Sequence, residues 1–437
     1  MSDRAHQRSR LGRVVVYIVA VTAVLALLAG VGWLFVNPHR GEATAAQTTL
    51  ALDHRLSRED AVADLDYLVG TVEDRHVWAA SGLPDPVEQA WRAQVAALPE
   101  SPTVVDVWRA SGRILTALGD GHTFSAPLLP DDQAFGADLR IVDGQLEVRV
   151  GDGHRPVAQV NRVDVADLFA RNRALTPADN DGWVEGRLLE RLRTGAGLAL
   201  LDAPPDGDYV ITYQDARGAR GDLVVEKVEQ TDHTGDLPSA EYAVDGALAV
   251  LTVHTCIPDD TYRAALAGFF EEVHAGGLQE LVVDLRGNRG GDSHVVDLFV
   301  EYLDVDRIPS GSTKARFGPF VIPLGSGTME GRKHAHPYDG EILVLTDHST
   351  FSSATDFATV LSDNDLAQVI GEPPGSAPTG AGDVVVFELP TSGLFMQVSY
   401  KHFQRPDPTL PANILEVDRH ADPTGAVEAM IAGDDGT

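Results

Sequence analysis

Leu281-Val-Val-Asp-Leu-Arg-Gly-Asn-Arg-Gly-Gly291 is the stretch that decides the fold, because an apolar run of strand length breaks directly into a glycine-rich turn. A second apolar run, Ile342–Thr346, leads into a polar turn and then a helical pattern over Ser353–Leu361. Helical periodicity also covers Thr261–His274 and Ser293–Leu303. This alternation predicts an α/β domain with a largely parallel or mixed sheet, and it places functional groups at the C-terminal ends of the strands.

The same patterns divide the rest of the folded chain. Residues 56–126 are predicted to form an N-terminal helical domain, since apolar side chains recur at helical spacing after the capping pair Ser57 and Asp60. Residues 127–235 show short alternating runs separated by Asp-Gly turns, which predicts a β-rich middle domain. We assign residues 236–425 to the α/β catalytic core and 426–437 to a tail.

The N-terminus carries an apolar segment, residues 14–36, that contains no charged side chain. Its length suits a transmembrane helix, and arginines crowd the preceding residues 1–13, which predicts a cytoplasmic N-terminus. A cleaved signal peptide is the alternative, because small residues near position 44 offer a cleavage site. Either way, we expect a linker over 37–55 and a catalytic region outside the cytoplasm, held at the cell membrane if the segment is retained.

Composition excludes several classes of partner and cofactor. The formal net charge of −31 repels nucleic acid and anionic lipid. Cys256 is the only cysteine, so no intrachain disulfide can form, and its apolar setting favours a buried thiol. His334 and His336 lie near Asp339 without a third ligand at a characteristic spacing, so we predict no metal and no cofactor.

Two residues are candidates for nucleophilic catalysis. Ser352 follows the strand at Ile342–Thr346 and opens a helix, where the helix dipole favours a developing alkoxide. An ordinary helix cap is the alternative role for such a serine. His122 follows a glycine turn in Gly119-Asp-Gly-His-Thr123, a position that suits a general base as well as a surface or capping residue.

Backbone amides in the turn at Gly290 and Gly291 have the composition of an anion cradle, and therefore of an oxyanion hole. A tight strand-to-helix connection, which needs glycine for its geometry alone, explains the same residues equally well.

Four motifs together resemble the tail-specific, or C-terminal processing, serine peptidase family, and especially its tricorn-core-like branch. They are Asp-Gly-His-Thr at 120–123, Asp-Leu-Arg-Gly-Asn-Arg-Gly-Gly at 284–291, Thr-Phe-Ser-Ser-Ala at 350–354 and Gly-Glu-Pro-Pro-Gly at 371–375. The resemblance implies a crotonase-like β-β-α core behind a helical domain, with a peptide or protein as substrate. It places Ser352 on the nucleophile, His122 on the base, and Gly290, Gly291 and the Ser353 amide on the oxyanion hole.

The resemblance also bears on the group that assists the serine. Family members with a Ser-Lys dyad carry a lysine about two dozen residues after the serine, and the stretch Glu372–Asp383 contains none. A Ser-His arrangement with a carboxylate behind the imidazole is then the implied alternative. Glu416 is the nearest match for that carboxylate, and Asp383 and Asp120 are alternatives.

Two further points stay open at this stage. Many family members insert a PDZ domain before the core, and the middle domain has suitable composition without a clear carboxylate-binding loop. Some relatives have lost catalysis, so an extracytoplasmic binding protein is the alternative function. The sequence does not indicate an oligomeric state.

Overall fold

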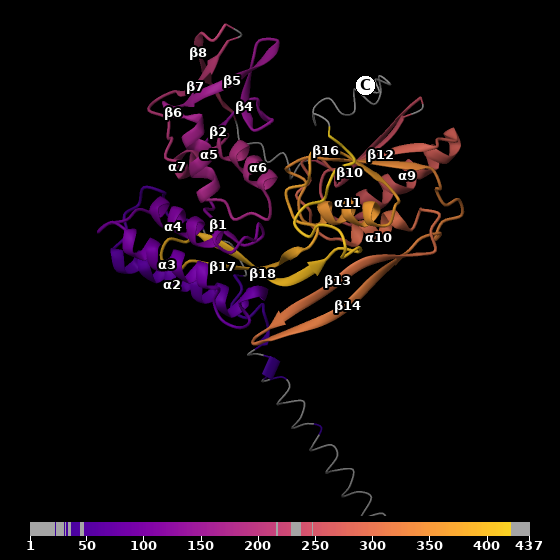
Figure 1. Cartoon of the computed structure of the whole chain (residues 1–437), viewed down its shortest axis with the longest axis horizontal. Coiled ribbons are helices and arrows are strands. Elements are labelled where there is room, and N and C mark those ends of the chain that lie inside the picture. The colour runs from indigo at the N-terminus through magenta and orange to yellow at the C-terminus, as the bar shows by residue number, and fades with distance from the viewer. Residues whose placement is uncertain are drawn as a thin grey trace, which may run out of the picture.

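The computed structural model describes residues 22, 30, 32–33, 36–43, 48–215, 217–228, 237–246 and 248–420. It has a helical part, a β-rich part and an α/β part, shown in indigo, magenta and orange in Figure 1. Most of the segment 14–36 and all of 1–13 and 426–437 lie outside the described residues. Within the described ranges, no helix has the length and apolarity needed to cross a membrane.

The N-terminal part is helical. Its elements are α2 (Arg58–Arg75), η1 (Val77–Ala79), α3 (Asp85–Ala97) and α4 (Val104–Thr116). The Ser57 hydroxyl caps α2 by accepting a hydrogen bond from the Asp60 amide at 3.0 Å, and Thr103 and Asp106 form a capping box on α4. The capping box fixes the start of α4, and the loop that carries His122 follows the end of this helix.

A long antiparallel sheet joins this helical part to the core. Its strands are β1 (Phe124–Ala126), β13 (Arg307–Phe317), β14 (Phe320–Glu330), β17 (Gly380–Glu388) and β18 (Phe395–Gln404), with β1, β13 and β17 all pairing with β18. Val385, Met396 and Val398 bury their side chains in the same cluster as the apolar faces of α2 and α4. Residues from the two ends of the chain thus share one hydrophobic core.

The middle part combines an antiparallel sheet with three helices. Its sheet has the order β3-β4-β5-β7-β8, with β3 (Leu139–Val142), β4 (Gln145–Val150), β5 (Gly153–Val160), β7 (Tyr209–Gln214) and β8 (Arg220–Val225). The remaining elements are β6 (Val163–Asp164), α5 (Val165–Ala174), α6 (Asp181–Arg191), α7 (Gly195–Leu200), and the pair β2 (Ala134–Phe135) and β9 (Lys227–Val228). The middle part therefore contains helices as well as strands.

The α/β core contains the sheet β10-β11-β12-β15-β16-β19. Its elements are β10 (Ala240–Asp245), β11 (Leu248–Val253), α9 (Asp260–Gly276), β12 (Glu280–Asp284), α10 (His294–Val300), β15 (Glu341–Thr346), α11 (Ser353–Asp363), β16 (Gln368–Gly371) and β19 (Arg419–His420). The pairings from β11 to β19 are parallel, and β10 is antiparallel to β11. This is the mixed α/β arrangement that the strand–helix alternation predicted.

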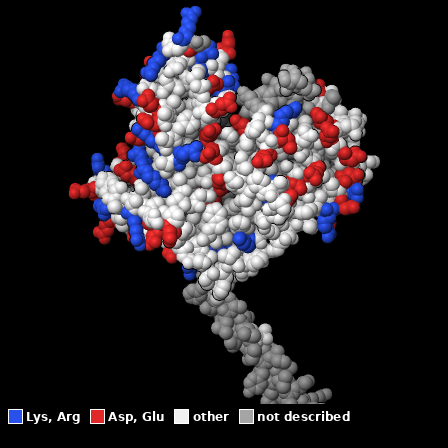
Figure 2. Space-filling view, in the orientation of Figure 1, with Lys and Arg blue, Asp and Glu red and all other residues white. Residues whose placement is uncertain are grey.

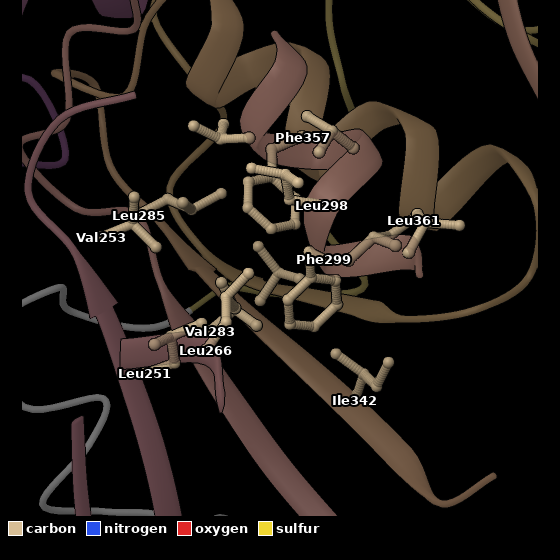
Figure 3. Close-up of a cluster of buried hydrophobic side chains, with 14 of the residues drawn as sticks. Leu251, Val253, Leu266, Val283, Leu285, Leu298, Phe299, Ile342, Phe357 and Leu361 are labelled. Carbon is tan, nitrogen blue, oxygen red and sulfur yellow. The ribbon is translucent and has the colours of Figure 1, made fainter. Parts of the chain in front are cut away.

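The packing of this core fixes where β12 and β15 end. Phe299 of α10 and Phe357 of α11 lie against the strands that carry Leu251 and Val283 (Figure 3), and all four side chains are fully buried. Burying a large apolar side chain stabilises the fold by about 1.5 to 3 kcal/mol. The glycine turn after β12 and the serine turn after β15 are adjacent because the two strands pair in parallel register.

Candidate active site

A cavity of about 780 Å³ lies where the three parts of the chain meet. The loop after α4 contributes His122, and α6 contributes Trp183 and Arg187. The turns after β12 and β15 contribute Gly291 and Ser352. Residues of β17 and β18 complete the wall. The structure therefore gathers the predicted serine, histidine and glycine turn into a single cavity.

Ser352 occupies a strained backbone conformation at the start of α11. Its φ of 55° and ψ of −124° lie in a region that residues with a side chain rarely adopt. Although it holds the N-cap position, its side chain makes no capping hydrogen bond, whereas its amide donates to the Ser376 hydroxyl at 2.8 Å. The Ser352 side chain therefore does not cap α11. Its strained backbone instead places the hydroxyl at a sharp strand-to-helix turn.

The neighbouring Ser353 is engaged differently. Its hydroxyl donates a hydrogen bond to the Gly291 carbonyl at 2.8 Å and accepts one from the Ser293 hydroxyl at 3.1 Å. Ser353 is also buried. Its side chain thus ties α11 to the glycine turn, while its backbone amide stands at the first turn of the helix, where amides lack intrahelical acceptors.

The amides of Gly290 and Gly291, the two glycines that end the turn after β12, differ in their hydrogen bonding. The Gly290 amide donates to the Asn288 side chain at 2.8 Å, so this donor is already used. Within the described part of the chain, no acceptor is found for the amides of Gly291 and Ser353. Gly290 also lies so close to Ser352 that an added Cβ would stand 2.7 Å from the serine Cβ. The turn therefore needs glycine for close packing and also leaves amides unpaired beside the serine.

The His122 imidazole is held between the cavity wall and a buried carboxylate. Its ring packs on Phe351 with centroids 4.5 Å apart, and its Nε2 lies on the side of Gly382, which lines the cavity. Its Nδ1 lies 3.8 Å from Asp120 Oδ1. This nitrogen is buried and has no hydrogen-bond partner among the described residues.

Asp120 is fully buried and is held by several donors. It accepts hydrogen bonds from the His122 amide at 2.9 Å, from His76 Nε2 at 2.9 Å and from the Thr123 hydroxyl at 2.5 Å. His76 Nδ1 accepts from the Trp78 amide, which leaves the His76 proton on Nε2, facing Asp120. Burial alone would raise the pKa of Asp120, but the hydrogen bond from His76 and the electrostatic effect of His122 hold that pKa well below its usual range. Asp120 is thus a fixed negative charge beneath the imidazole.

A second buried carboxylate, Asp179, was not anticipated from the sequence. It precedes α6 and accepts hydrogen bonds from the Gly121 amide at 3.0 Å and the Ala377 amide at 3.1 Å. One carboxylate therefore bridges the histidine loop and the loop that supports the Ser352 amide. Burial raises the pKa of Asp179 to about 6, and the nearby Asp120 charge adds to this rise.

Arg187 and Arg289 also escaped sequence analysis, and both line the cavity. Their guanidiniums lie 5.7 Å and 5.1 Å from the Trp183 ring, and both form ion pairs with Glu190. Partial burial lowers the pKa of each to about 10, and the charge of Arg187 contributes to the shift of Arg289. Arg187 lies on α6 and Arg289 in the glycine turn after β12. Arginines at such positions ordinarily lie in solvent, so no local pattern distinguishes these two.

The other predicted acids and the lysine lie in different surroundings. Lys401 lines the cavity but forms an ion pair with Asp383. Burial opposes the charge of Lys401, yet the ion pair prevails and raises its pKa, so the ammonium stays protonated. Glu416 is exposed between β18 and β19 and is not among the residues that line the cavity. Of the three carboxylates weighed from sequence, Asp120 is the one that faces the imidazole.

Comparison with solved structures agrees with this architecture. The structure of mature CPAF complexed with lactacystin aligns with a TM-score of 0.66 at 12% identity, covering 86% of this chain and 96% of that one. A second structure of mature CPAF aligns with a TM-score of 0.64 at 13% identity, covering 87% and 99%. At such identity the likeness shows the fold. A comparison with curated protein sequences finds no match.

The family comparison gives the class of protein. Residues 215–417, which include the glycine turn and Ser352, match the model of peptidase family S41. Together with the fold, this match defines the chain as a serine peptidase. More particularly, the matched region is similar to the peptidase domains of family S41. The predicted enzyme class is thus confirmed, while the tricorn-core-like branch remains a prediction.

Proposed function

We propose that this serine peptidase cleaves peptides or proteins outside the cytoplasm, through an acyl-enzyme on Ser352 with His122 as general base. The observation that carries the proposal is the uncapped hydroxyl of Ser352, which shares one cavity with the imidazole and with unpaired amides. These groups together offer the nucleophile, the general base and the oxyanion-hole donors that acyl transfer requires.

The geometry supports a definite order of steps. His122 Nε2 removes the proton from the Ser352 hydroxyl as its oxygen attacks the scissile carbonyl carbon. The oxygen of that carbonyl becomes negatively charged and accepts hydrogen bonds from the amides of Gly291 and Ser353. Preorganised donors of this kind contribute about 3 to 4 kcal/mol each. The imidazolium then protonates the leaving amine, and a water activated by the same imidazole hydrolyses the acyl-enzyme.

We assign to Asp120 the role of the carboxylate that stabilises the His122 imidazolium. Its Oδ1 faces Nδ1 at 3.8 Å, and its low pKa keeps it charged at neutral pH. Asp179 acts as a positioning residue, because its two accepted hydrogen bonds hold the His122 loop against the Ser376 loop. Glu416 has no role in this mechanism.

The location outside the cytoplasm rests on the uncharged segment 14–36 and its basic N-terminal flank. We propose that this segment anchors the peptidase to the cell membrane, with the cavity on the outer side. Protease added to intact cells should degrade the folded region. A chain that is protected until the cells are lysed would contradict this location.

A fluorescent fluorophosphonate probe tests the chemistry directly, because it phosphonylates an activated serine. Wild type should be labelled, and Ser352→Ala and His122→Ala should not. Ser353→Ala is the matched control: it removes the adjacent hydroxyl but keeps the amide, so labelling should persist. A folded wild type that takes no label would support the non-catalytic binding protein instead.

A further inference from the structure

The tip of the β13–β14 hairpin exposes an unusual amount of apolar surface. Five consecutive residues of β14, Phe320-Val-Ile-Pro-Leu324, are apolar. Phe320, Ile322 and Leu324 are 61%, 45% and 53% exposed. The hairpin runs to the lower end of the molecule in Figure 1, and Figure 2 shows that end mostly without charged side chains. Contiguous exposed apolar surface of this kind marks a contact site.

The pattern along the strand indicates which kind of contact. Successive side chains of a strand point to opposite faces, so a strand that packs one face on protein alternates apolar and polar residues. Residues 320–324 do not alternate. The nearest charge in the partner strand, Arg316, is buried and donates to the Gly318 and His76 carbonyls at 2.7 Å. Lys314, which pairs with Pro323, is exposed, so the apolar surface is concentrated at the hairpin end formed by Phe317, Phe320 and Ile322, with a lysine beside it. An apolar end bordered by a lysine suits the interface of a lipid bilayer, where a lysine extends its charged head toward water.

Strand addition by a second chain is disfavoured at this edge. β14 is the last strand in its sheet order, but Pro323 has no amide to donate and Gly325 has a φ of 107°. The pairing with β13 also shifts register between Thr313 and Lys314. Proline and bulges at an edge are features that prevent further strands from pairing.

The tip lies beside the end of the N-terminal apolar segment. The Trp33 and Phe317 rings have centroids 6.0 Å apart, and Val36 packs beside Gly318. A hollow of about 480 Å³ is lined by apolar residues from both: Gly32, Trp33, Val36, Phe317, Phe320 and Ile322. The exposed tip is therefore continuous with the sequence segment whose composition suits a lipid bilayer.

We propose that the β13–β14 tip inserts into the outer interface of the lipid bilayer beside the N-terminal segment. Aromatic side chains are favoured at that depth, as Trp33 and Phe320 would be there. Because β13 pairs with β18, which lines the cavity through Lys401 and Phe403, the inserted tip fixes the orientation of the active site relative to the membrane. The inference rests on the proposed membrane location, and it is independent of the proposed catalytic chemistry.

Site-directed spin labelling of the full chain in phosphatidylcholine vesicles tests this proposal. Cys256 is buried and burial raises the pKa of its thiol to about 12, so an introduced cysteine can be labelled selectively. Ile322→Cys carries the label at the tip. Val224→Cys is the control, since Val224 is 56% exposed on β8 of the middle part.

The label at 322 should collide more with oxygen, which concentrates in lipid, than with a water-soluble nickel complex. The label at 224 should show the reverse preference. A chain that floats with the vesicles but has a water-exposed label at 322 overturns this proposal alone. A label at 322 that is shielded from both reagents indicates contact with a second copy and overturns it too. A chain that does not float with vesicles overturns the membrane location as well, while fluorophosphonate labelling reports separately on the catalytic chemistry.

Discussion

The Asp120→Asn variant tests whether the buried carboxylate supports the imidazole. The substitution keeps the size and one acceptor oxygen, so the His122 amide can retain its hydrogen bond. It removes the negative charge that faces Nδ1 at 3.8 Å. It also turns an amide group toward both His76 Nε2 and the Thr123 hydroxyl, because both donate to the same oxygen, Oδ2, of the wild-type carboxylate.

The expected loss follows from the distance. At 3.8 Å and an effective dielectric constant of about 20, a carboxylate stabilises an imidazolium by about 4 kcal/mol. The imidazolium exists only once His122 has taken the serine proton, so this energy lowers the barrier. The rate constant for labelling should therefore fall about 1,000-fold. The mispaired amide should separately lower the free energy of unfolding by about 1 to 3 kcal/mol.

The assay is the second-order rate constant for fluorophosphonate labelling, measured on protein whose fold is checked by thermal unfolding. Thr123→Val is the matched control, because it removes a hydrogen bond from the same carboxylate but keeps the charge. It should destabilise the fold to a similar degree and slow labelling less than about tenfold. A folded Asp120→Asn variant that is labelled within threefold of the wild-type rate would refute the assigned role.

Three other substitutions address the remaining acids. Glu416→Gln should leave the labelling rate within about twofold of wild type, because Glu416 is exposed and outside the cavity lining; a loss resembling that of Asp120→Asn would restore its predicted role. Asp179→Asn can accept only one of its two amide hydrogen bonds, so labelling should slow about tenfold or more, and an unchanged rate would show that this bridge does not position His122. Burial raises the pKa of Asp356, which lies on α11, to about 6 from 3.8. The preference of the folded state for the protonated carboxyl therefore stabilises the fold fully below about pH 4, and this stabilisation is lost as pH rises through 6. Between pH 4.5 and 7.5, calorimetry should therefore show Asp356→Asn gaining stability relative to wild type, by up to about 3 kcal/mol, and parallel curves would contradict the assigned cause.

The sequence was informative wherever local chemistry and local structure coincide. The apolar run at Leu281 forms β12, the run at Ile342 forms β15, and the turns that follow them lie together because parallel strands end at one edge. Ser352 and Gly291 could be predicted for that reason. His122 could be singled out by its glycine turn, but its proximity to the serine required the antiparallel sheet that joins the helical part to the core.

The features that were missed depend on contacts between distant segments. Asp179 lies in an irregular loop, and its two partners are 58 and 198 residues away along the chain. Arg187 resembles any solvent-facing helical arginine until α6 packs over the cavity. The β13–β14 hairpin escaped notice because β14 is exposed almost throughout, so burial imposes no alternation on its sequence.

The most direct test of the catalytic assignment is to identify the modified residue after fluorophosphonate treatment of the full chain. Peptide mass spectrometry should place the phosphonyl adduct on the Ser352 oxygen and leave Ser353 unmodified, with one adduct per chain. An adduct on Ser353 or on another residue, in a folded chain whose Ser352 stays unmodified, would contradict the account.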